Sequence, residues 1–270
     1  MNQTLAAQTE TAARAPAEVY DEEFVPAVFS HWGPVLCDAA GVTSGQRVLD
    51  VACGTGALTV AVADRVLPGG AALGLDANAQ MLAVARRKHS AIEWFEGPAE
   101  SLPFEDATFD AVVSQFGLMF FTDRIAALRE MWRVLRPGGR LAVAVCDDVE
   151  HSPGYASLAA LLDRLFGKRI GDAFRAPFVL GDGDALRALC TGADIANARI
   201  VQRHRTVRFA SIDALVSTER ACAWTLGGVL DDQQFEKLRR EAQSTFAPFI
   251  DTCGRVAFEM PALIITATKN

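Results

Sequence analysis

Two carboxylates flank a glycine-rich turn early in the chain, and their spacing is the first sign of chemistry. Asp50 lies inside the apolar stretch VLDVA, which runs directly into ACGTG with its glycines Gly54 and Gly56. Glycines let a backbone approach a ligand closely, and a helix that begins after such a turn presents N–H groups to that ligand. Asp76 ends the next apolar stretch, 20 residues beyond Gly56. Dinucleotide-binding folds place there the carboxylate that accepts hydrogen bonds from ribose hydroxyls.

This spacing predicts an adenosine-containing ligand with Asp76 as its main anchor. A hydrogen bond to a charged acceptor contributes about 1.5–3 kcal/mol, against ~0.3–1 kcal/mol for a charge at a helix end. Nicotinamide or flavin dinucleotides and S-adenosylmethionine both fit such a site. A pyrophosphate cradle requires a third glycine where this chain has Thr59, and a carboxylate at Asp50 would repel pyrophosphate. Asp50 can instead hold the ammonium group of a methionyl moiety, directly or through water, so the residues favour S-adenosylmethionine.

Each acid also has a structural alternative. Asp50 can be a buried carboxyl satisfied only by backbone N–H groups, and Asp76 can be a cap for the helix that begins near Asn78.

Alternating strands and helices surround these residues and predict a doubly wound, mostly parallel α/β sheet. Apolar stretches typical of strands occur at 47–52, 71–76, 92–97, 109–117, 140–147, 198–209 and 262–269. Asp182 is the expected N-cap of a helix over 182–193. A mostly helical block at about 211–250 lies between the last two strands and is interpreted as an insertion. Such sheets bind ligands at the carboxyl ends of their strands.

Composition argues against several classes of function. The chain has 270 residues, half of them apolar, and a net charge of −7, so we expect neither a nucleic-acid partner nor an acidic membrane surface. No apolar run reaches the ~18–20 residues of a membrane span. The six cysteines are scattered without a C-x-x-C pair, which predicts reduced thiols and no metal site. The first residues lack the order of a signal peptide, so a cytoplasmic protein is expected.

Four successive motifs resemble those of class I S-adenosylmethionine-dependent methyltransferases. The motifs are VLDVACGTG, GLDANAQML, GPAESLPFEDATFDAVVSQFGLMFF and ALREMWRVLRPGGRLAVAV, which together occupy roughly residues 45–147. They are most similar to the small-molecule group that includes the ubiquinone/menaquinone biosynthesis methyltransferases, the type 11 methyltransferase domain. The resemblance implies a Rossmann-like sheet of seven strands, mostly parallel, with an antiparallel last strand and a helical insertion that acts as a lid.

The same resemblance implies a division of the chain. Residues 1–17 would be a flexible N-terminal tail, and residues 18–44 would form cap helices over the cofactor. Residues 45–150 would form the S-adenosylmethionine-binding core. Residues 151–270 would complete the sheet, with the insertion at about 211–250 lying over the acceptor site.

Carried over residue by residue, the resemblance implies a set of cofactor contacts. Asp76 would take the ribose hydroxyls, and the acidic residue common before the Ala-Glu pair is replaced here by Pro98. The other implied contacts are Asp50, Ala52, Cys53, Gly54 and Gly56 at the methionyl part, Ala77 and Met81 at the ribose and adenine, Ala99 and Glu100 at the adenine edge, and Ser114 and Gln115 under the amino-acid moiety.

The implied reaction is in-line transfer of a methyl group to a small, partly apolar or aromatic acceptor, releasing S-adenosylhomocysteine. A general base is needed only if the acceptor is a hydroxyl or a protonated amine. His151, after the fifth strand, is a candidate base, and the candidates for the acceptor pocket are Tyr20, His31, Trp32, Met119 and Trp224. The open alternatives are an NAD(P)-dependent oxidoreductase and a non-catalytic cofactor-binding protein. The atom methylated and the formation of a homodimer are not determined by the sequence.

Overall fold

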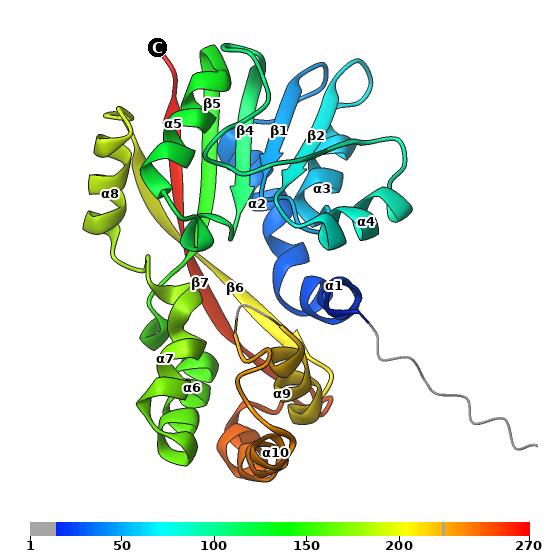
Figure 1. Ribbon diagram of the computed structural model, residues 1–270, viewed down its shortest axis with the longest axis vertical. Coiled ribbons are helices and arrows are strands. Elements are labelled where there is room, and N and C mark those ends of the chain that lie inside the picture. The colour runs from blue at the N-terminus through cyan, green and yellow to red at the C-terminus, as the bar shows by residue number, and fades with distance from the viewer. Residues whose placement is uncertain (1–14, 223–224) are drawn as a thin grey trace, which may run out of the picture.

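The computed structural model describes residues 15–222 and 225–270, which contain one seven-stranded sheet (Figure 1). Most of the expected N-terminal tail, residues 1–14, lies outside the described residues. The strand order is β3-β2-β1-β4-β5-β7-β6. The strands are β1 Arg47–Val51, β2 Ala71–Asp76, β3 Glu93–Glu96, β4 Phe109–Gln115, β5 Leu135–Cys146, β6 Arg199–Phe209 and β7 Val256–Thr268.

The first five strands are parallel, and β7 runs antiparallel to both β5 and β6. This confirms the predicted mostly parallel sheet with an antiparallel last strand. The chain builds β2 and β3 on one side of β1 and then crosses to place β4 and β5 on the other side. The strand order therefore reverses between β1 and β4, which is where open α/β sheets bind ligands.

Helices cover both faces of the parallel part of the sheet. Residues 141–146 of β5 are all buried, as expected for a strand covered on both faces. Helices α2 and α3 contact each other and pack on the parallel strands as one group. Helices α5 and α8 form a second group, in which α5 packs on β4 and β5. The helix bounds are α1 Pro16–Val19, α2 Gly33–Ala40, α3 Ala57–Val66, α4 Ala79–Lys88, α5 Arg124–Val134, α6 Pro153–Phe166, α7 Lys168–Arg175, α8 Gly183–Gly192, α9 Ile212–Ala221 and α10 Asp232–Phe246.

Two of these helices begin at capping side chains that the sequence indicates. Asp182 accepts hydrogen bonds from the N–H groups of Asp184 and Ala185, which confirms it as the N-cap of α8. Asn78 does the same for α4 through Gln80 and Met81. No helix among the described residues is long and apolar enough to cross a membrane.

The last two strands are long and carry the chain beyond the parallel core (Figure 1). Strand β7 begins at Val256, six residues before the expected start. Figure 1 shows α6, α7, α9 and α10 gathered around this projecting half, with α6 packed on β7 and α9 on β6. The helical block expected between the last two strands therefore lies beside the first residues of β7, 256–261. The sequence had not indicated that these residues belong to the strand.

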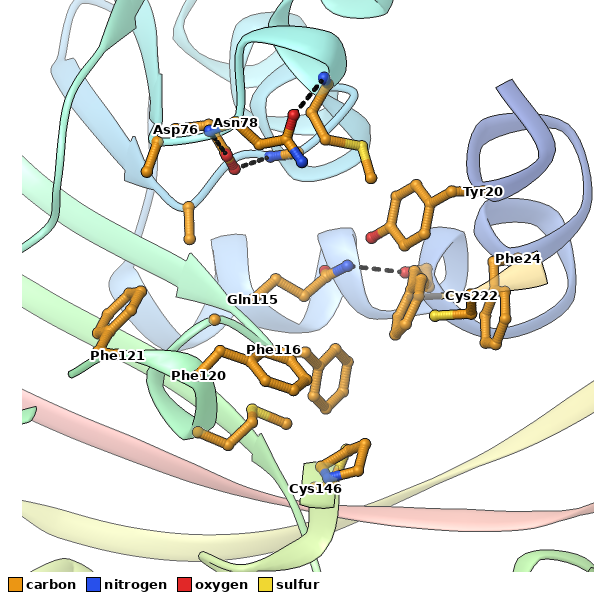
Figure 2. Close-up of a pocket in the computed structure, with 18 of the residues that line it drawn as sticks. Tyr20, Phe24, Asp76, Asn78, Gln115, Phe116, Phe120, Phe121, Cys146 and Cys222 are labelled. Atoms are coloured by element: carbon orange, nitrogen blue, oxygen red, sulfur yellow. Dashed lines mark hydrogen bonds between the residues drawn. The ribbon is translucent and has the colours of Figure 1, made fainter. Parts of the chain in front are cut away.

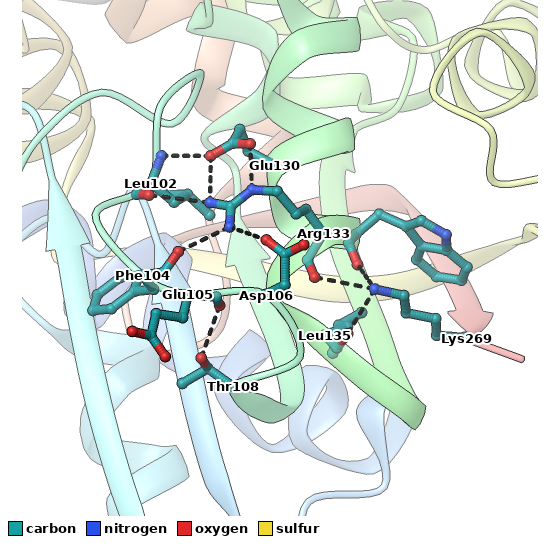
Figure 3. A network of polar contacts seen from close by, with 10 residues as sticks. Leu102, Phe104, Glu105, Asp106, Thr108, Glu130, Arg133, Leu135 and Lys269 are labelled. Carbon is teal, nitrogen blue, oxygen red and sulfur yellow. Dashed lines mark hydrogen bonds and ion pairs between the residues drawn. The ribbon is translucent and has the colours of Figure 1, made fainter.

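Arg133 of α5 fixes the loop that follows β3 (Figure 3). Its guanidinium donates to the backbone carbonyls of Leu102 and Phe104 and pairs with the carboxylates of Asp106 and Glu130. Glu130 in turn accepts the N–H of Leu102 at 2.8 Å. Lys269 closes the end of α5 by donating to the backbone carbonyls of residues 132, 133 and 135. A loop of about ten residues is thereby held against the parallel core.

We expect Arg133→Met to lower the free energy of unfolding at pH 7 by about 1.5–3 kcal/mol, because the charged hydrogen bonds to the loop are lost. Arg133 holds the pKa of Glu130 below its ordinary value of 4.5. That stabilisation is present above pH 4.5 and is lost as the pH falls through the folded pKa, so the difference between the variant and the wild type should shrink in acid to the part contributed by the carbonyls of Leu102 and Phe104. Urea unfolding across pH 3–7 measures this. Arg187→Met, which removes an exposed arginine, is the control, and an equal effect of the two substitutions would contradict the assignment.

Candidate functional site

A pocket of about 770 Å³ opens at the carboxyl ends of the parallel strands (Figure 2). This volume lies within the ~300–1,000 Å³ typical of small-molecule sites. One wall comes from the turns after β1, β2 and β4, and a second comes from the π-helical segment Tyr20–Phe29. The third wall comes from the helical half, through residues of α6, α7, α9 and β7. The pocket therefore joins the parallel core to the projecting half.

The backbone around the pocket adopts left-handed conformations at several points. Gly54 has φ 56°, and the non-glycine residues Ala52 and Phe116 have φ 60° and 56°. All three line the pocket, and strained backbone of this kind concentrates at ligand sites. Gly56 also has a positive φ, 93°, and has a second reason to be glycine: a Cβ there would lie 2.6 Å from the ring of Trp94. Gly56 thus allows the turn to pack on β3 and does not face the pocket.

The carboxylate of Asp76 is fixed by two backbone N–H groups. One oxygen accepts from Gly54 and the other from Asn78, both at 2.8 Å. Helix α4 is capped by the Asn78 side chain, so capping is not the only role of Asp76, which lines the pocket. Burial raises the pKa of Asp76, and these two N–H groups oppose the rise. The hydrogen bonds couple the turn after β1 to the end of β2.

Asp50 lies behind the glycine turn and is not part of the pocket lining. It is 1% exposed, and one of its oxygens accepts from the hydroxyl of Thr59 at 2.7 Å. Its Oδ1 has no hydrogen-bond partner within the described residues. Burial raises the pKa of Asp50 to about 8, Thr59 opposes this rise, and the nearby charge of Asp76 adds to it. Thr59 occupies the position of the third glycine in a dinucleotide motif, and its hydroxyl is the hydrogen-bond donor to Asp50 in this chain.

The other predicted cofactor residues divide into two groups. Glu100 accepts the N–H groups of Thr122 and Asp123 at 2.9 and 3.2 Å, so its carboxylate ties the loop after β3 to the start of α5. The predicted residues that line the pocket are Ala52, Gly54, Asp76, Ala77, Met81, Ala99, Glu100 and Gln115. The other four predicted residues do not line the pocket, because they are packed behind the turn or within the strands. They are Asp50, Cys53, Gly56 and Ser114.

Gln115 is the polar residue at the end of β4 that reaches the pocket. Its Nε2 donates to the backbone carbonyl of Phe29 at 3.2 Å, which attaches the π-helical segment to the sheet. Its Oε1 is buried without a partner in the described part of the chain. Figure 2 shows its side chain projecting into the pocket, with Asp76 on one side and Phe116 on the other. An acceptor oxygen is therefore presented to a ligand.

Among the residues predicted for the acceptor pocket that the structure describes, Tyr20 and Met119 line it, whereas His31 and Trp32 do not. His31 is exposed, and Trp32 is fully buried with its ring edge-on to Phe116 at 5.6 Å. The candidate base His151 has a side chain 58% exposed, with Nδ1 at 3.1 Å from the buried carboxylate of Asp147. His151 is thus placed outside the pocket, at the surface. Trp224 lies outside the described residues.

The sequence analysis placed the helical insertion over the acceptor site but named only Trp224 there as a site residue, and none of the described residues of the wall that the helical half contributes. Glu219 of α9 is the polar member of this wall, 1% exposed, and burial raises its pKa to about 7. A signal for it existed: Ile212, Leu215 and Val216 lie seven, four and three residues before Glu219 and are buried with it. A glutamate on the apolar face of an amphipathic helix is unusual. Other lining residues not predicted as site residues are Phe24, Phe29, Cys146, Tyr155, Phe174, Phe178, Cys222, Thr225 and Met260.

The electrostatic character of the pocket is acidic. Its lining includes the carboxyl groups of Asp76, Glu100 and Glu219, and across the described residues it includes no lysine, arginine or histidine. Much of the remaining lining is aromatic. The described residues contain no group of three or more His, Cys, Asp or Glu side chains arranged to hold a metal ion. Such a pocket suits a cationic ligand with flat, apolar parts, and it offers no positive charge to a pyrophosphate.

We expect the buried Asp50 to make the protein less stable as the pH rises. Its pKa is about 8 in the folded chain and 3.8 ordinarily. Between these pH values the folded chain keeps a proton that the unfolded chain has lost, so the free energy of unfolding falls as the pH rises from 3.8 to 8. Asp50→Asn should reduce the fall in the free energy of unfolding between pH 5 and 8 by roughly 1–3 kcal/mol. Urea unfolding at both pH values measures this change. Asp184→Asn, at an exposed aspartate, should retain the wild-type slope, and an unchanged slope in Asp50→Asn would refute the assignment.

Comparison with known proteins relates the first half of the chain to one family. Residues 26–157 match the profile of the ubiE/COQ5 methyltransferase family. The chain is 39% identical over 120 residues to a chloroplastic 2-phytyl-1,4-beta-naphthoquinone methyltransferase of Arabidopsis thaliana, and 47% identical over 118 residues to the ubiquinone/menaquinone biosynthesis C-methyltransferase UbiE of Hahella chejuensis. Each match spans 42% of this chain and about half of the relative, 46% and 47% respectively.

Solved structures extend the similarity in fold over most of the chain. The YcgJ protein of Bacillus subtilis is 21% identical with a TM-score of 0.59, covering 89% of this chain and 98% of its own. A protein from an antibiotic biosynthesis pathway of Anabaena variabilis is 17% identical with a TM-score of 0.62, covering 88% of this chain and 96% of its own. The chain thus has the Rossmann-like methyltransferase fold, and its first half resembles the class I methyltransferases of quinone biosynthesis, as the motifs predicted.

Proposed function

We propose that this protein is an S-adenosylmethionine-dependent methyltransferase acting on a small, flat, partly apolar acceptor of quinone-like character. The observation that carries the proposal is the pocket at the strand switch point, which is acidic and aromatic and has no lysine, arginine or histidine in its described lining. A sulfonium and an ammonium group are the cationic parts of S-adenosylmethionine, and an acidic, aromatic site favours both. The similarity to quinone methyltransferases over residues 26–157 supports the same reading.

The residues present fit this cofactor. Asp76 has a second lone pair on each oxygen after accepting from Gly54 and Asn78, so it can still accept from two ribose hydroxyls. Ala77 and Met81, also in the lining, would contact the sugar and the adenine ring. The unpartnered Oε1 of Gln115 would face the amino-acid part. Asp50 would act through its charge, from behind the turn.

The cofactor, when bound, supplies an activated methyl group on a positively charged sulfur. The contribution of the chain is to align the acceptor with that methyl group and to exclude water, and alignment of this kind accounts for about 7–11 kcal/mol of a barrier. The hydrogen bond from Gln115 to the carbonyl of Phe29 holds the π-helical segment across the pocket. The rings of Tyr20 and Phe29, 5.5 Å apart, then shield the site from solvent.

We further propose that the regions of the chain divide this work. Residues 45–150 would hold the cofactor, and residues 18–44 would cover it. Residues 151–270 would shape the acceptor end, since α6, α7, α9 and β7 supply that wall. Two relatives of this chain are named as methyltransferases of a naphthoquinone and of demethylmenaquinone. The aromatic lining of the pocket suits a flat ring system of this kind.

Asp76→Asn should weaken binding of S-adenosylhomocysteine by about tenfold or more, because one charged hydrogen bond to the ribose is lost. Isothermal calorimetry on the purified protein measures the affinity. Asp182→Asn is the matched control, since Asp182 also accepts two backbone N–H groups but caps α8, a helix that contributes no residue to the pocket lining. Binding that is absent in the wild type, or equal in both variants, would defeat the proposal.

Cofactor binding at pH 7 should release protons from the protein. The pKa of Asp50 is about 8 without a ligand, so the group is mostly protonated at pH 7, and a cation bound near the turn would lower that pKa. Calorimetry of S-adenosylhomocysteine binding in buffers of different ionisation enthalpy measures the protons released. The release should shrink in Asp50→Asn and persist in Asp184→Asn, whereas an Asp50→Asn variant that releases as many protons as the wild type would rule out this coupling.

A further inference from the structure

Glu219 stands out as a buried acid that the cofactor does not need. It lies on α9 in the wall built by the helical half, whereas Asp76 and Gln115 lie at the ends of β2 and β4. It is 1% exposed and lines the pocket. A carboxyl group is rarely buried without a partner, because leaving water costs several kcal/mol. Its position therefore requires a function.

The hydrogen bonds around Glu219 leave one oxygen available. The hydroxyl groups of Thr225 and Tyr155 lie near its carboxyl group and oppose the rise in the pKa of Glu219 that burial causes. The hydroxyl of Thr225 donates at 2.9 Å to the backbone carbonyl of Glu219, which holds the end of α9 in place. Oε2 is buried and has no hydrogen-bond partner among the described residues. Glu219 thus lines the pocket and keeps one buried carboxyl oxygen without a hydrogen-bond partner among the described residues.

Aromatic rings surround this group and define the shape of what it can bind. Tyr155 packs against Phe174, Phe178 and Phe258 with ring centroids 5.8, 5.7 and 5.0 Å away. Of these rings, Tyr155, Phe174 and Phe178 line the pocket. The polar part of a ligand at this end must therefore be one hydrogen-bond donor on a flat apolar frame.

We propose that Glu219 accepts the hydroxyl proton of an aromatic methyl acceptor. This inference rests on the proposed methyltransferase function and names the residue that acts as its base. Within the described residues, the pocket lining has no histidine to perform this role, and His151 is at the surface.

The proposed step balances in atoms and charge. The O–H bond of the acceptor breaks, its proton moves to the ionised carboxylate of Glu219, and its electron pair remains on the acceptor. The acceptor oxygen, or a ring carbon conjugated with it, then bonds to the methyl carbon as the carbon–sulfur bond breaks, and that electron pair goes to sulfur. The products are the methylated acceptor, neutral S-adenosylhomocysteine and protonated Glu219. Where carbon is the nucleophile, loss of its ring proton to solvent restores aromaticity.

The groups facing Glu219 leave it able to change protonation near neutrality. They are Tyr155 of α6, Cys146 at the end of β5, and Cys222 after α9. Burial raises the pKa of both Tyr155 and Cys146, so neither is charged near pH 7. On the neighbouring π-helical segment, Glu23 bonds to Thr218. Since the pKa of Glu219 is about 7, its carboxylate form should gain population as the pH rises from 6 to 8.

The test uses two probes of similar shape, 2-naphthol and 2-methylnaphthalene, with the full chain saturated with S-adenosylhomocysteine. Calorimetry should give an affinity about tenfold or more in favour of 2-naphthol, because only the hydroxyl donates to the carboxylate. This preference should increase between pH 6 and 8. In Glu219→Gln the preference should largely disappear and lose its pH dependence, while S-adenosylhomocysteine binding should stay as in the wild type. Glu236→Gln, at an exposed glutamate of α10, should behave as the wild type.

Each outcome decides between the two proposals. Failure of the wild type to bind S-adenosylhomocysteine would overturn the proposed function itself. Normal binding of that compound, combined with equal affinities for the two probes or with a naphthol preference that survives in Glu219→Gln, would overturn the role of Glu219 alone. If circular dichroism shows that Glu219→Gln does not fold, the test depends on the wild-type protein alone. A wild-type preference for 2-naphthol that does not change between pH 6 and 8 then refutes the proposal.

Discussion

The hydrogen bond from the N–H of Gly54 to the carboxylate of Asp76 is the contact on which the site depends. It joins the turn after β1 to the end of β2, next to the place where the strand order reverses. The left-handed conformation of Gly54 directs its N–H group at that carboxylate, and the N–H of Asn78 fixes the other oxygen. A carboxylate held in this way is oriented before any ligand arrives, so little conformational entropy is lost on binding.

Buried acids carry a cost in stability that a purely structural core would avoid. Burial raises the pKa of Asp50, Asp76 and Glu219 alike. Each acid therefore makes the folded chain less stable once the pH rises above the ordinary pKa of its carboxyl group. A hydrophobic residue at any of the three positions would remove that cost. Their common feature is proximity to one pocket whose described lining has no basic side chain. A cationic cofactor would offset the repulsion at Asp50 and Asp76, and the proposed acceptance of a proton gives a separate physical reason for keeping Glu219.

The sequence predicted the parallel core well because its signals are local. The glycine turn, Asp76 and the start of the helix near Asn78 all lie within 29 residues, from position 50 to position 78, and each depends on neighbours in the chain. The hydrogen-bond partner of Asp50 was not predictable, because the motif gives the position of Asp50 along the strand and not the hydroxyl of Thr59 that donates to it. Nor could the surface position of His151 be foreseen, since it depends on where the segment after β5 turns.

The acceptor end was hidden from sequence analysis because it is assembled from distant segments. Tyr155 and Glu219 are 64 residues apart in the sequence, and the early start of β7 at Val256 brings Met260 into the same wall. No single motif spans these residues, and the family match ends at residue 157, before most of them. A scaffold of this kind keeps cofactor binding in one contiguous unit and places acceptor recognition on elements that can vary independently. The polar groups of the helical half, Glu219 foremost, are therefore where this chain can differ in acceptor from the quinone methyltransferases that it resembles.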